Sequence, residues 1–150
     1  MTDYTALYNE APRVKRLHPN ATLPTRAHEH DAGWDLHALE HDHLQPGETR
    51  MIRTGIAIAV PVGQCGDVRS RSGLASRNIT VTNSPGTIDP GYTGEVKVLL
   101  SNRTAKRFTI NPGDRIAQLV FTYTNTQPLV EVDELEDSER GTNGFGSTGA

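Results

Sequence analysis

The feature that most constrains the fold of this chain is a two-residue alternation of apolar and polar side chains within short segments. The alternation is clearest over residues 49–62, where Ile52, Ile56, Ile58 and Val60 share one face of an extended chain. Successive side chains of a strand point to opposite sides, so this segment is predicted to form one half-buried β-strand. The same period recurs over residues 79–81, 95–98, 108–110 and 116–123.

Glycine and proline turns separate these alternating segments. Turn signals of this kind occur at residues 45–48, 61–63, 84–86, 89–91 and 111–114. Short strands with turns at this spacing are typical of an all-β sandwich, barrel or jelly roll. Residues 73–77, which follow Ser72, are the one stretch that suggests a helix, and that stretch is short. We therefore predict an all-β domain with at most one short helix.

Length, cysteine content and charge exclude several classes of protein. A chain of 150 residues with a single cysteine, Cys65, can form neither an intramolecular disulfide nor a cysteine zinc cage, which favours a cytoplasmic location. The first twenty residues contain no apolar run that resembles a signal peptide, and no apolar run reaches membrane-spanning length, so no membrane partner is expected. Six acidic residues lie within residues 131–139, which leaves the rest weakly basic but without a basic stripe. This balance argues against a nucleic-acid partner and is compatible with a small anionic ligand.

The C-terminal end differs from the rest of the chain. The alternation is lost after residue 130, and a glycine-rich end follows the acidic stretch. We predict a core over residues 1–130 and a flexible arm over residues 131–150. The arm carries Arg140, Phe145, Gly146 and Ser147. A guanidinium and a hydroxyl can donate to phosphate, a ring can stack on a base, and glycine lets the backbone approach a ligand closely.

Four further segments combine glycine with charged and polar residues, at residues 32–38, 71–75, 86–95 and 113–120. Together with the glycine-rich end, they follow in an order that resembles the five motifs of the trimeric dUTPase family, which hydrolyses dUTP to dUMP and pyrophosphate. The resemblance covers about residues 24–149. It implies a jelly roll of the β-clip type and a homotrimer with sites between subunits. It also implies a role in keeping uracil out of DNA and supplying dUMP for dTMP synthesis.

The resemblance gives the third motif the central chemical role. Asp89 is implied to be the general base that activates water for attack on the α-phosphorus, with Mg²⁺ carried by the triphosphate. Tyr92 is implied to pack under the deoxyribose and to exclude a 2′-hydroxyl. A hairpin in this segment is expected to read uracil with its backbone, at Asn83, Gly86, Thr87 and Ile88. Lys97 either borders that pocket or faces solvent.

Three other motifs are implied to contact the phosphates. Arg71, Ser72 and Gly73 resemble a phosphate-binding loop, although a serine in this place is also a common helix cap. Gln118 is implied to contact phosphate or its water shell, and otherwise it is a buried amide that needs a partner. Asp35 is compatible with two roles, contact with magnesium through water or orientation of Arg71.

Two positions depart from the family pattern without removing a chemical group. Ser70 stands where the family usually has proline, and Asn143 stands where it usually has glycine. Neither change is expected to abolish activity, because asparagine tolerates a positive φ and serine alters only the rigidity of the loop.

Three alternatives accompany this interpretation. His28, His30, His41 and His43 form two His-x-His pairs that could bind zinc, although a surface coincidence is favoured. A dCTP deaminase of the same fold is a second possible function, but it requires a glutamate on the strand after the hairpin. The third alternative is a nucleotide-switched protein that regulates a partner.

Overall fold

The computed structural model describes residues 10–144, and almost all of its regular structure is β-strand. Its one helix, α1, spans only Ser72–Ala75. The strands are β1 (Arg13–Arg16), β2 (Gly33–His37), β3 (Asp42–Leu44), β4 (Thr49–Arg53), β5 (Ile56–Ala59), β6 (Gln64–Arg69), β7 (Ile79–Val81), β8 (Gly86–Ile88), β9 (Lys97–Asn102), β10 (Phe108–Ile110) and β11 (Arg115–Tyr123). The prediction of an all-β fold with one short helix is confirmed.

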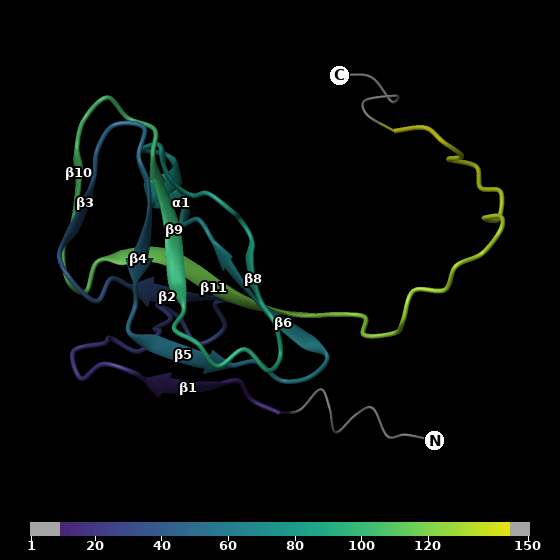
Figure 1. The fold of residues 1–150 in the computed structure, drawn as a ribbon, viewed down its shortest axis with the longest axis horizontal. Coiled ribbons are helices and arrows are strands. Elements are labelled where there is room, and N and C mark those ends of the chain that lie inside the picture. The colour runs from purple at the N-terminus through teal and green to yellow at the C-terminus, as the bar shows by residue number, and fades with distance from the viewer. Residues whose placement is uncertain (1–9, 145–150) are drawn as a thin grey trace.

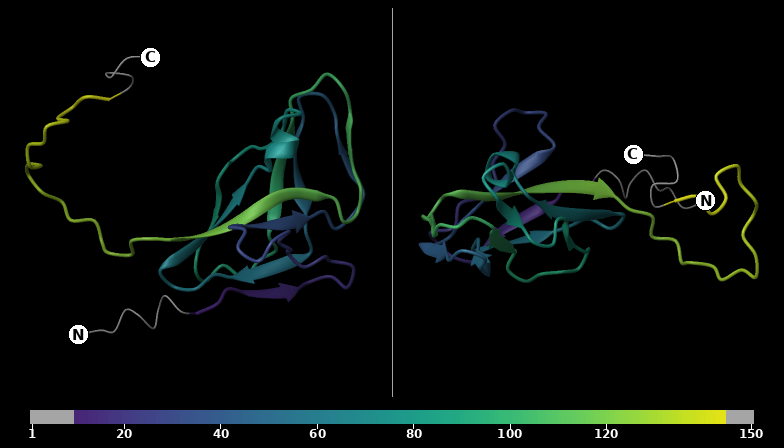
Figure 2. Two further views of the ribbon diagram at one scale, coloured as in Figure 1. Left: turned by 180° about the vertical axis from the view of Figure 1, so that it is seen from behind. Right: turned by 90° about the horizontal axis from the view of Figure 1, so that it is seen from above.

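The strands form two larger sheets and two pairs. The larger sheets have the orders β2-β11-β6-β8 and β4-β9-β7, and the pairs are β1-β5 and β10-β3. Every pairing is antiparallel, and the chain crosses repeatedly between sheets, as in a jelly roll. Figures 1 and 2 show β11 extending across the body of the molecule. Apolar side chains from both larger sheets, among them Leu36, Ile52, Val98, Leu100 and Leu119, form the buried core.

The prediction of a single strand over residues 49–62 is wrong, because the chain turns a corner within this segment. β4 pairs with β9, whereas β5 pairs with β1 in a different sheet. Gly55 stands between them with a φ of +71°, a conformation that favours glycine. A Cβ at Gly55 would lie 3.0 Å from both Ala21 Cβ and Leu39 Cδ1. The alternating face stays buried on both sides of the corner, since Ile52 and Ile56 are each 1% exposed.

The hairpin expected around Asp89 is also not formed as a pair of hydrogen-bonded strands. β8 pairs with β6, and β9 pairs with β4 and β7. Residues 89–96 therefore cross from one larger sheet to the other. This separation opens the space in which the candidate site lies.

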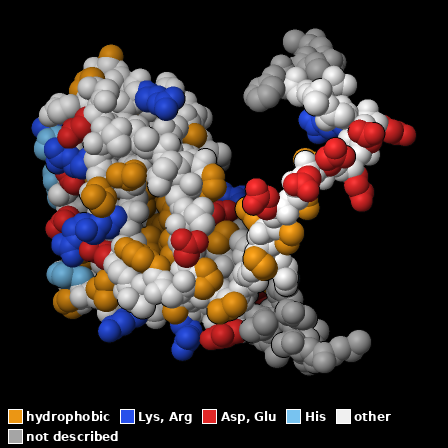
Figure 3. Space-filling model, turned by 45° about the vertical axis from the view of Figure 1, so that its right-hand side comes forward, with side chains coloured by type: hydrophobic (Ala, Val, Ile, Leu, Met, Phe, Trp, Pro, Cys, Tyr) orange, Lys and Arg blue, Asp and Glu red, His pale blue; other side chains and the backbone are white. Residues whose placement is uncertain are grey.

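The chain leaves the body of the protein after β11. Residues 124–144 contain neither helix nor strand, and Figure 1 shows this segment running away from the sheets. Leu129, Val130 and Leu135 are at least 79% exposed there, and acidic side chains line the same segment (Figure 3). The boundary at residue 130 stays a prediction, and Phe145, Gly146 and Ser147 lie outside the described residues. Within residues 10–144, no helix has the length and apolar character needed to span a membrane.

The corner at Gly55 makes a testable prediction about stability. Gly55→Ala should lower the free energy of unfolding by about 2–4 kcal/mol, because it combines a disfavoured φ with overpacking against Ala21 and Leu39. Gly47→Ala is the matched control, since its φ is +75° but nothing lies within 4 Å of the added Cβ. It should cost only about 1 kcal/mol, as measured by urea unfolding at one protein concentration. Equal losses would show that packing at the corner does not matter.

Candidate functional site

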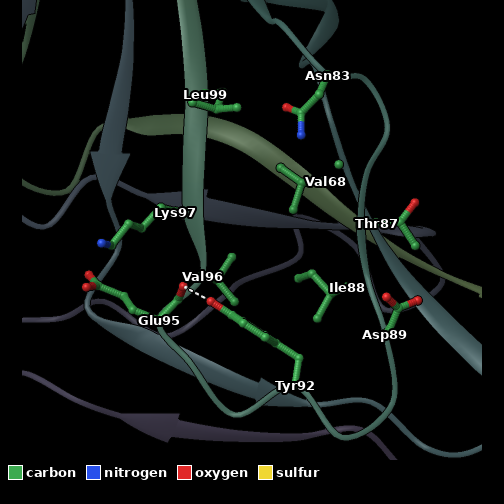
Figure 4. A pocket seen from close by; sticks show the side chains of 11 residues that line it. Val68, Asn83, Thr87, Ile88, Asp89, Tyr92, Glu95, Val96, Lys97 and Leu99 are labelled. Carbon is green, nitrogen blue, oxygen red and sulfur yellow. Dashed lines mark hydrogen bonds between the residues drawn. The ribbon is translucent and has the colours of Figure 1, made fainter.

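A cleft of about 210 Å³ opens where β8 and β9 diverge into different sheets, and we call it the β8–β9 cleft. It is lined by Val68, Asn83, Gly86, Thr87, Ile88, Asp89, Tyr92, Glu95, Val96, Lys97 and Leu99 (Figure 4). β8 is the last strand of its sheet, and β7 pairs with β9 only over Leu100–Asn102. Backbone groups at strand edges are therefore available to a flat polar ligand in the cleft.

The side chains of β8 divide between the two sides of the strand. Ile88 points into the space between the strands with Val68, whereas Thr87 and Asp89 lie on the other side of β8 (Figure 4). The structure thus brings the predicted base-reading residues to one cleft and leaves Asp89 exposed at its edge. A Cβ at Gly86 would lie 3.0 Å from the Asn83 amide nitrogen, so the glycine allows that amide to lie against the strand.

Tyr92 lies at the mouth of this cleft and Lys97 lies on its β9 side. Tyr92 is 48% exposed, and its hydroxyl donates to the backbone carbonyl of Glu95 at 3.0 Å (Figure 4). Lys97 is exposed and borders the cleft, so its position is compatible with both roles considered from the sequence, a border of the pocket and a solvent-facing side chain.

A second cleft, of about 420 Å³, contains the residues of the other motifs, and we call it the arginine cleft. The Asp35 carboxylate accepts from Arg71 Nε at 2.7 Å and from Arg115 Nη1 at 3.5 Å. The two guanidiniums carry more N–H donors than the Asp35 carboxylate accepts, so unused donors remain in this cleft, which Asp31 also lines. Such donors suit an anion with several oxygens. Of the two roles open for Asp35, orientation of Arg71 is the one that this geometry supports.

Gln118 uses its amide to hold the loop that precedes Arg71. Gln118 Nε2 donates to the Ser70 carbonyl at 2.9 Å, which supplies the partner that this amide needs. A Cβ at Gly33 would collide with the Gln118 side chain, so the glycine makes room for it. The Ser70 hydroxyl in turn accepts from the Val81 amide at 2.8 Å. The loop is therefore tied to two neighbouring strands.

Ser72 is the first residue of α1 and does not cap it. The N-cap residue is Arg71, no side-chain capping hydrogen bond is formed, and Ser72 is exposed. The first amides of any helix have no partner within the helix, and here they belong to Ser72 and Gly73, which line the arginine cleft. The interpretation of Ser72 as a helix cap is therefore wrong.

Arg115 is a member of the arginine cleft that the alternation pattern did not reveal. Arg115 and Gln118 are three positions apart, so a regular strand would point them to opposite faces. The register of β11 against β2 shifts between Arg115 and Ala117, and this bulge brings both side chains to the same cleft. Only its position inside the fourth motif could have drawn attention to Arg115.

Asp67 is a second residue that sequence reasoning missed. This buried carboxylate on β6 accepts from Arg69 Nη2 at 3.1 Å, Thr87 Oγ1 at 3.2 Å and Thr122 Oγ1 at 3.3 Å. Burial raises the pKa of Asp67, but these hydrogen bonds and the Arg69 charge outweigh it and lower the pKa below its usual value. Asp67 thus stays ionised and ties the short strand β8 to its sheet through Thr87.

The histidines do not assemble a metal site in the described part of the chain. Within residues 10–144, no group of three or more His, Cys, Asp or Glu side chains is arranged to hold a metal ion. Asp35 is engaged by two arginines.

The two clefts share no residue, and Asp89 and Arg71 lie toward opposite ends of the β6–β8 pair. Ile88 is opposite Gly66, so Asp89 lies next to Cys65, six residues from Arg71 along the direction of β6. At a rise of about 3.3 Å per residue, the backbones at Asp89 and Arg71 are roughly 20 Å apart. A general base and a group that binds the phosphate it acts on must lie much closer than this.

Comparison with known proteins agrees with this arrangement of motifs. A family model described as dUTPase matches residues 19–149. The chain belongs to the dUTPase family. A deoxyuridine 5′-triphosphate nucleotidohydrolase of Solibacter usitatus is 49% identical over 91% of this chain and 95% of its own length. The corresponding protein of Corynebacterium glutamicum is 46% identical over 99% of this chain and 98% of its own.

Solved structures of phage dUTPases have the same fold as this dUTPase-family chain. A mutant dUTPase of Staphylococcus bacteriophage 80alpha, solved with dUpNHpp, aligns with a TM-score of 0.89 and 32% identity over 95% of this chain and 100% of that one. A mutant dUTPase of phage phi11 of S. aureus, described as coordinating a structural Mg(II) ion, aligns with a TM-score of 0.79 and 30% identity. It covers 85% of this chain and 100% of that one.

His37, at the end of β2, is a buried group whose charge state is linked to the arginine cleft. It is 7% exposed, and its Nδ1 has no hydrogen-bond partner among the described residues. Burial lowers the pKa of His37 below 6.5; Asp35 opposes this shift, and Arg115 and Arg71 add to it. The imidazole is therefore held neutral in the folded protein.

We expect this neutral His37 to make stability depend on pH. The folded pKa is the lower one, so the unfolded chain binds more protons as the pH falls below 6.5, and stability is lost there. Between about pH 7.5 and about pH 5.5, the wild type should lose more unfolding free energy than His37→Gln, as measured by urea titration. An identical loss in both proteins would contradict this prediction.

Proposed function

We propose that this chain hydrolyses dUTP to dUMP and pyrophosphate in a site shared between copies of the chain. The observation that carries the proposal is the pairing of two complementary half-sites. One is a cleft bordered by strand edges with Asp89 beside it, and the other is a cleft with two guanidiniums on one carboxylate. Membership of the dUTPase family and relatives named as dUTP nucleotidohydrolases support the same reaction.

Asp89 acts as the general base. Its exposed carboxylate accepts a proton from a water molecule whose oxygen attacks the α-phosphorus. The bond between that phosphorus and the α,β-bridging oxygen breaks, and pyrophosphate leaves. Magnesium enters as part of the Mg·dUTP substrate and offsets negative charge on the departing group.

The β8–β9 cleft receives the nucleoside. Backbone groups from Gly86 to Ile88 and the Asn83 amide read the edge of uracil, and a slot of fixed size excludes the methyl group of thymine. Tyr92 packs under the deoxyribose and excludes a 2′-hydroxyl, while Lys97 borders the cleft from β9.

The arginine cleft receives the triphosphate of a nucleotide held by another copy. Arg71 and Arg115 keep donors free beside Asp35, and Ser72 and Gly73 line the same cleft. Gln118 acts by holding the Ser70 carbonyl and hence the loop. The separation of roughly 20 Å between Asp89 and Arg71 within one chain supports this sharing. A homotrimer with three such sites is the assembly we propose.

The C-terminal arm closes the site. It leaves the body after β11 and carries Arg140, whose Nε donates to the Asn143 carbonyl within the arm itself. We propose that Arg140, Phe145, Gly146 and Ser147 contact the nucleotide when the arm folds over it, which excludes water. The enzyme would thereby keep uracil out of DNA and supply dUMP for dTMP synthesis. The cytoplasmic location expected from the sequence stays a prediction.

The deaminase alternative receives no support from the strand that follows Asp89. β9 has the sequence KVLLSN, which contains no acidic residue. Glu95 precedes it, but its carboxylate is engaged by Arg53 and by the Gly55 amide. A regulatory partner, the third alternative, stays a prediction.

The proposed reaction is tested by measuring pyrophosphate release from dUTP, dTTP, dCTP and UTP, and ammonia release from dCTP. The proposal fails if dUTP is not the preferred substrate or if dCTP yields ammonia.

Asp89→Asn should lower turnover of dUTP by about 10²–10⁴-fold, because the amide keeps the shape but cannot accept the proton. Binding of dUpNHpp, measured by calorimetry, should be largely retained. Turnover near that of the wild type would remove Asp89 from the mechanism.

The same variant shows whether sites are shared. Arg71→Ala should also be inactive, and mixing it with Asp89→Asn under conditions that exchange subunits should restore activity. Sites with an intact Asp89 from one chain and an intact Arg71 from another then form. Mixtures that stay inactive after proven exchange would contradict a shared site.

Removing residues 139–150 should reduce turnover by at least about 10²-fold while the fold and the oligomeric state persist, because residues 139–144, the described part of this segment, form no helix or strand and contribute no residue to the core. Turnover, thermal unfolding and light scattering measure these three properties. A truncated protein that works at the full-length rate would show that the arm has no catalytic function.

A further inference from the structure

The ring of Tyr92 is held by a few specific contacts rather than by surrounding core. It is 48% exposed at the mouth of the β8–β9 cleft. Its hydroxyl donates to the Glu95 carbonyl at 3.0 Å, so the ring folds back across the turn that carries it (Figure 4). An aromatic ring with so little packing stays in one place only while such contacts persist.

Gly94 lies directly beneath this ring. A Cβ at Gly94 would be 2.5 Å from the Tyr92 hydroxyl oxygen and 2.7 Å from Cζ, closer than such atoms can approach. Gly91, in the same turn, has a φ of +87°, but Gly94 is not among the glycines with a positive φ. The ring, and not the backbone conformation, is therefore what requires glycine at position 94. Any side chain there would displace the ring, which is the movable end of Tyr92.

Glu95 fixes the other contact of the ring. Its carboxylate accepts from the Gly55 amide at 2.9 Å and from Arg53 Nε at 3.2 Å, and its side chain is only 14% exposed. These bonds attach the turn to the corner between β4 and β5. The backbone carbonyl that receives the Tyr92 hydroxyl is thereby held in place.

We propose that Gly94 and Glu95 are positioning residues that set the sugar selectivity of the site by fixing the ring of Tyr92. The inference rests on the proposed function, in which that ring excludes a 2′-hydroxyl. Steric exclusion depends on position, because repulsion rises steeply over less than 1 Å and a ring free to move yields to the added oxygen. Gly94 provides the space for the ring and Glu95 provides its acceptor.

The test is a double-mutant cycle read by the ratio of kcat/KM for dUTP to kcat/KM for UTP. Gly94→Ala should lower this ratio by about tenfold or more, mainly by raising activity on UTP. Tyr92→Ala should lower it as well. The double variant should match Tyr92→Ala, because no ring is left for the new methyl group to displace. A role in stability alone would not move the ratio.

Gly91→Ala is the matched control, because its Cβ would meet nothing within 4 Å. It should lose stability through its positive φ and keep the ratio. The inference would be overturned, with the proposed function still standing, if Gly94→Ala left the ratio unchanged. It would also be overturned if Gly94→Ala lowered the ratio equally in the wild type and in the Tyr92→Ala variant. If Tyr92→Ala also keeps the ratio, Tyr92 does not select the sugar and this inference fails with that role. The proposal that the chain hydrolyses dUTP would still stand.

Glu95 variants provide an independent measurement should Gly94→Ala fail to fold. Glu95→Ala removes both anchoring bonds and should lower the ratio severalfold. Glu95→Gln keeps an oxygen that can accept from the Gly55 amide and should restore most of the selectivity. Equal ratios in Glu95→Ala and the wild type would contradict the part assigned to Glu95.

Discussion

The backbone of Gly55 holds together the parts of this structure on which the candidate site depends. Its φ of +71° turns one alternating segment into two strands of different sheets. Its carbonyl accepts from the Leu17 amide at 2.8 Å, and its own amide donates to Glu95 at 2.9 Å. The corner thus satisfies its buried backbone groups and anchors the turn between β8 and β9 at the same time. The cleft exists because those two strands are held apart.

The arginine cleft shows how a folded chain keeps positive charge ready for a ligand. Asp35 is 17% exposed in its side chain and pairs with both Arg71 and Arg115, and Arg71 Nη1 also donates to the Arg115 carbonyl at 3.3 Å. A guanidinium has five N–H donors, so Arg71 and Arg115 each keep donors beyond those used in the contacts described. Burial and the two arginine charges lower the pKa of nearby His37, which disfavours a further positive charge there. The hydrogen bonds of Gln118 and Ser70 fasten the loop that carries Arg71 to two neighbouring strands.

Sequence patterns predicted the fold class and many of the strands, because each depends on local alternation and turn chemistry. Residues 79–81 and 108–110 form strands at the predicted bounds, and residues 116–123 fall within β11. The pattern failed where a corner interrupts an unbroken alternation, as at Gly55, since apolar residues continue on both sides of it. Nor did it show that Arg115 shares a cleft with Gln118, because a one-residue bulge changes the face on which Arg115 lies. Neither event leaves a periodic signal.

The sequence by itself determined the family and the groups available for chemistry, because ordered motifs identify both without any coordinates. Asp89, Arg71, Tyr92 and Gln118 could all be named from the chain alone. The tertiary structure alone decided how they are distributed: Asp89 and Tyr92 in one cleft, Arg71 and Gln118 in another. It also decided that Asp35 binds two arginines and that Gln118 holds a loop. The physical reason is that pairing, bulges and hydrogen-bond partners join residues far apart in the chain, whereas motif and periodicity describe only neighbours.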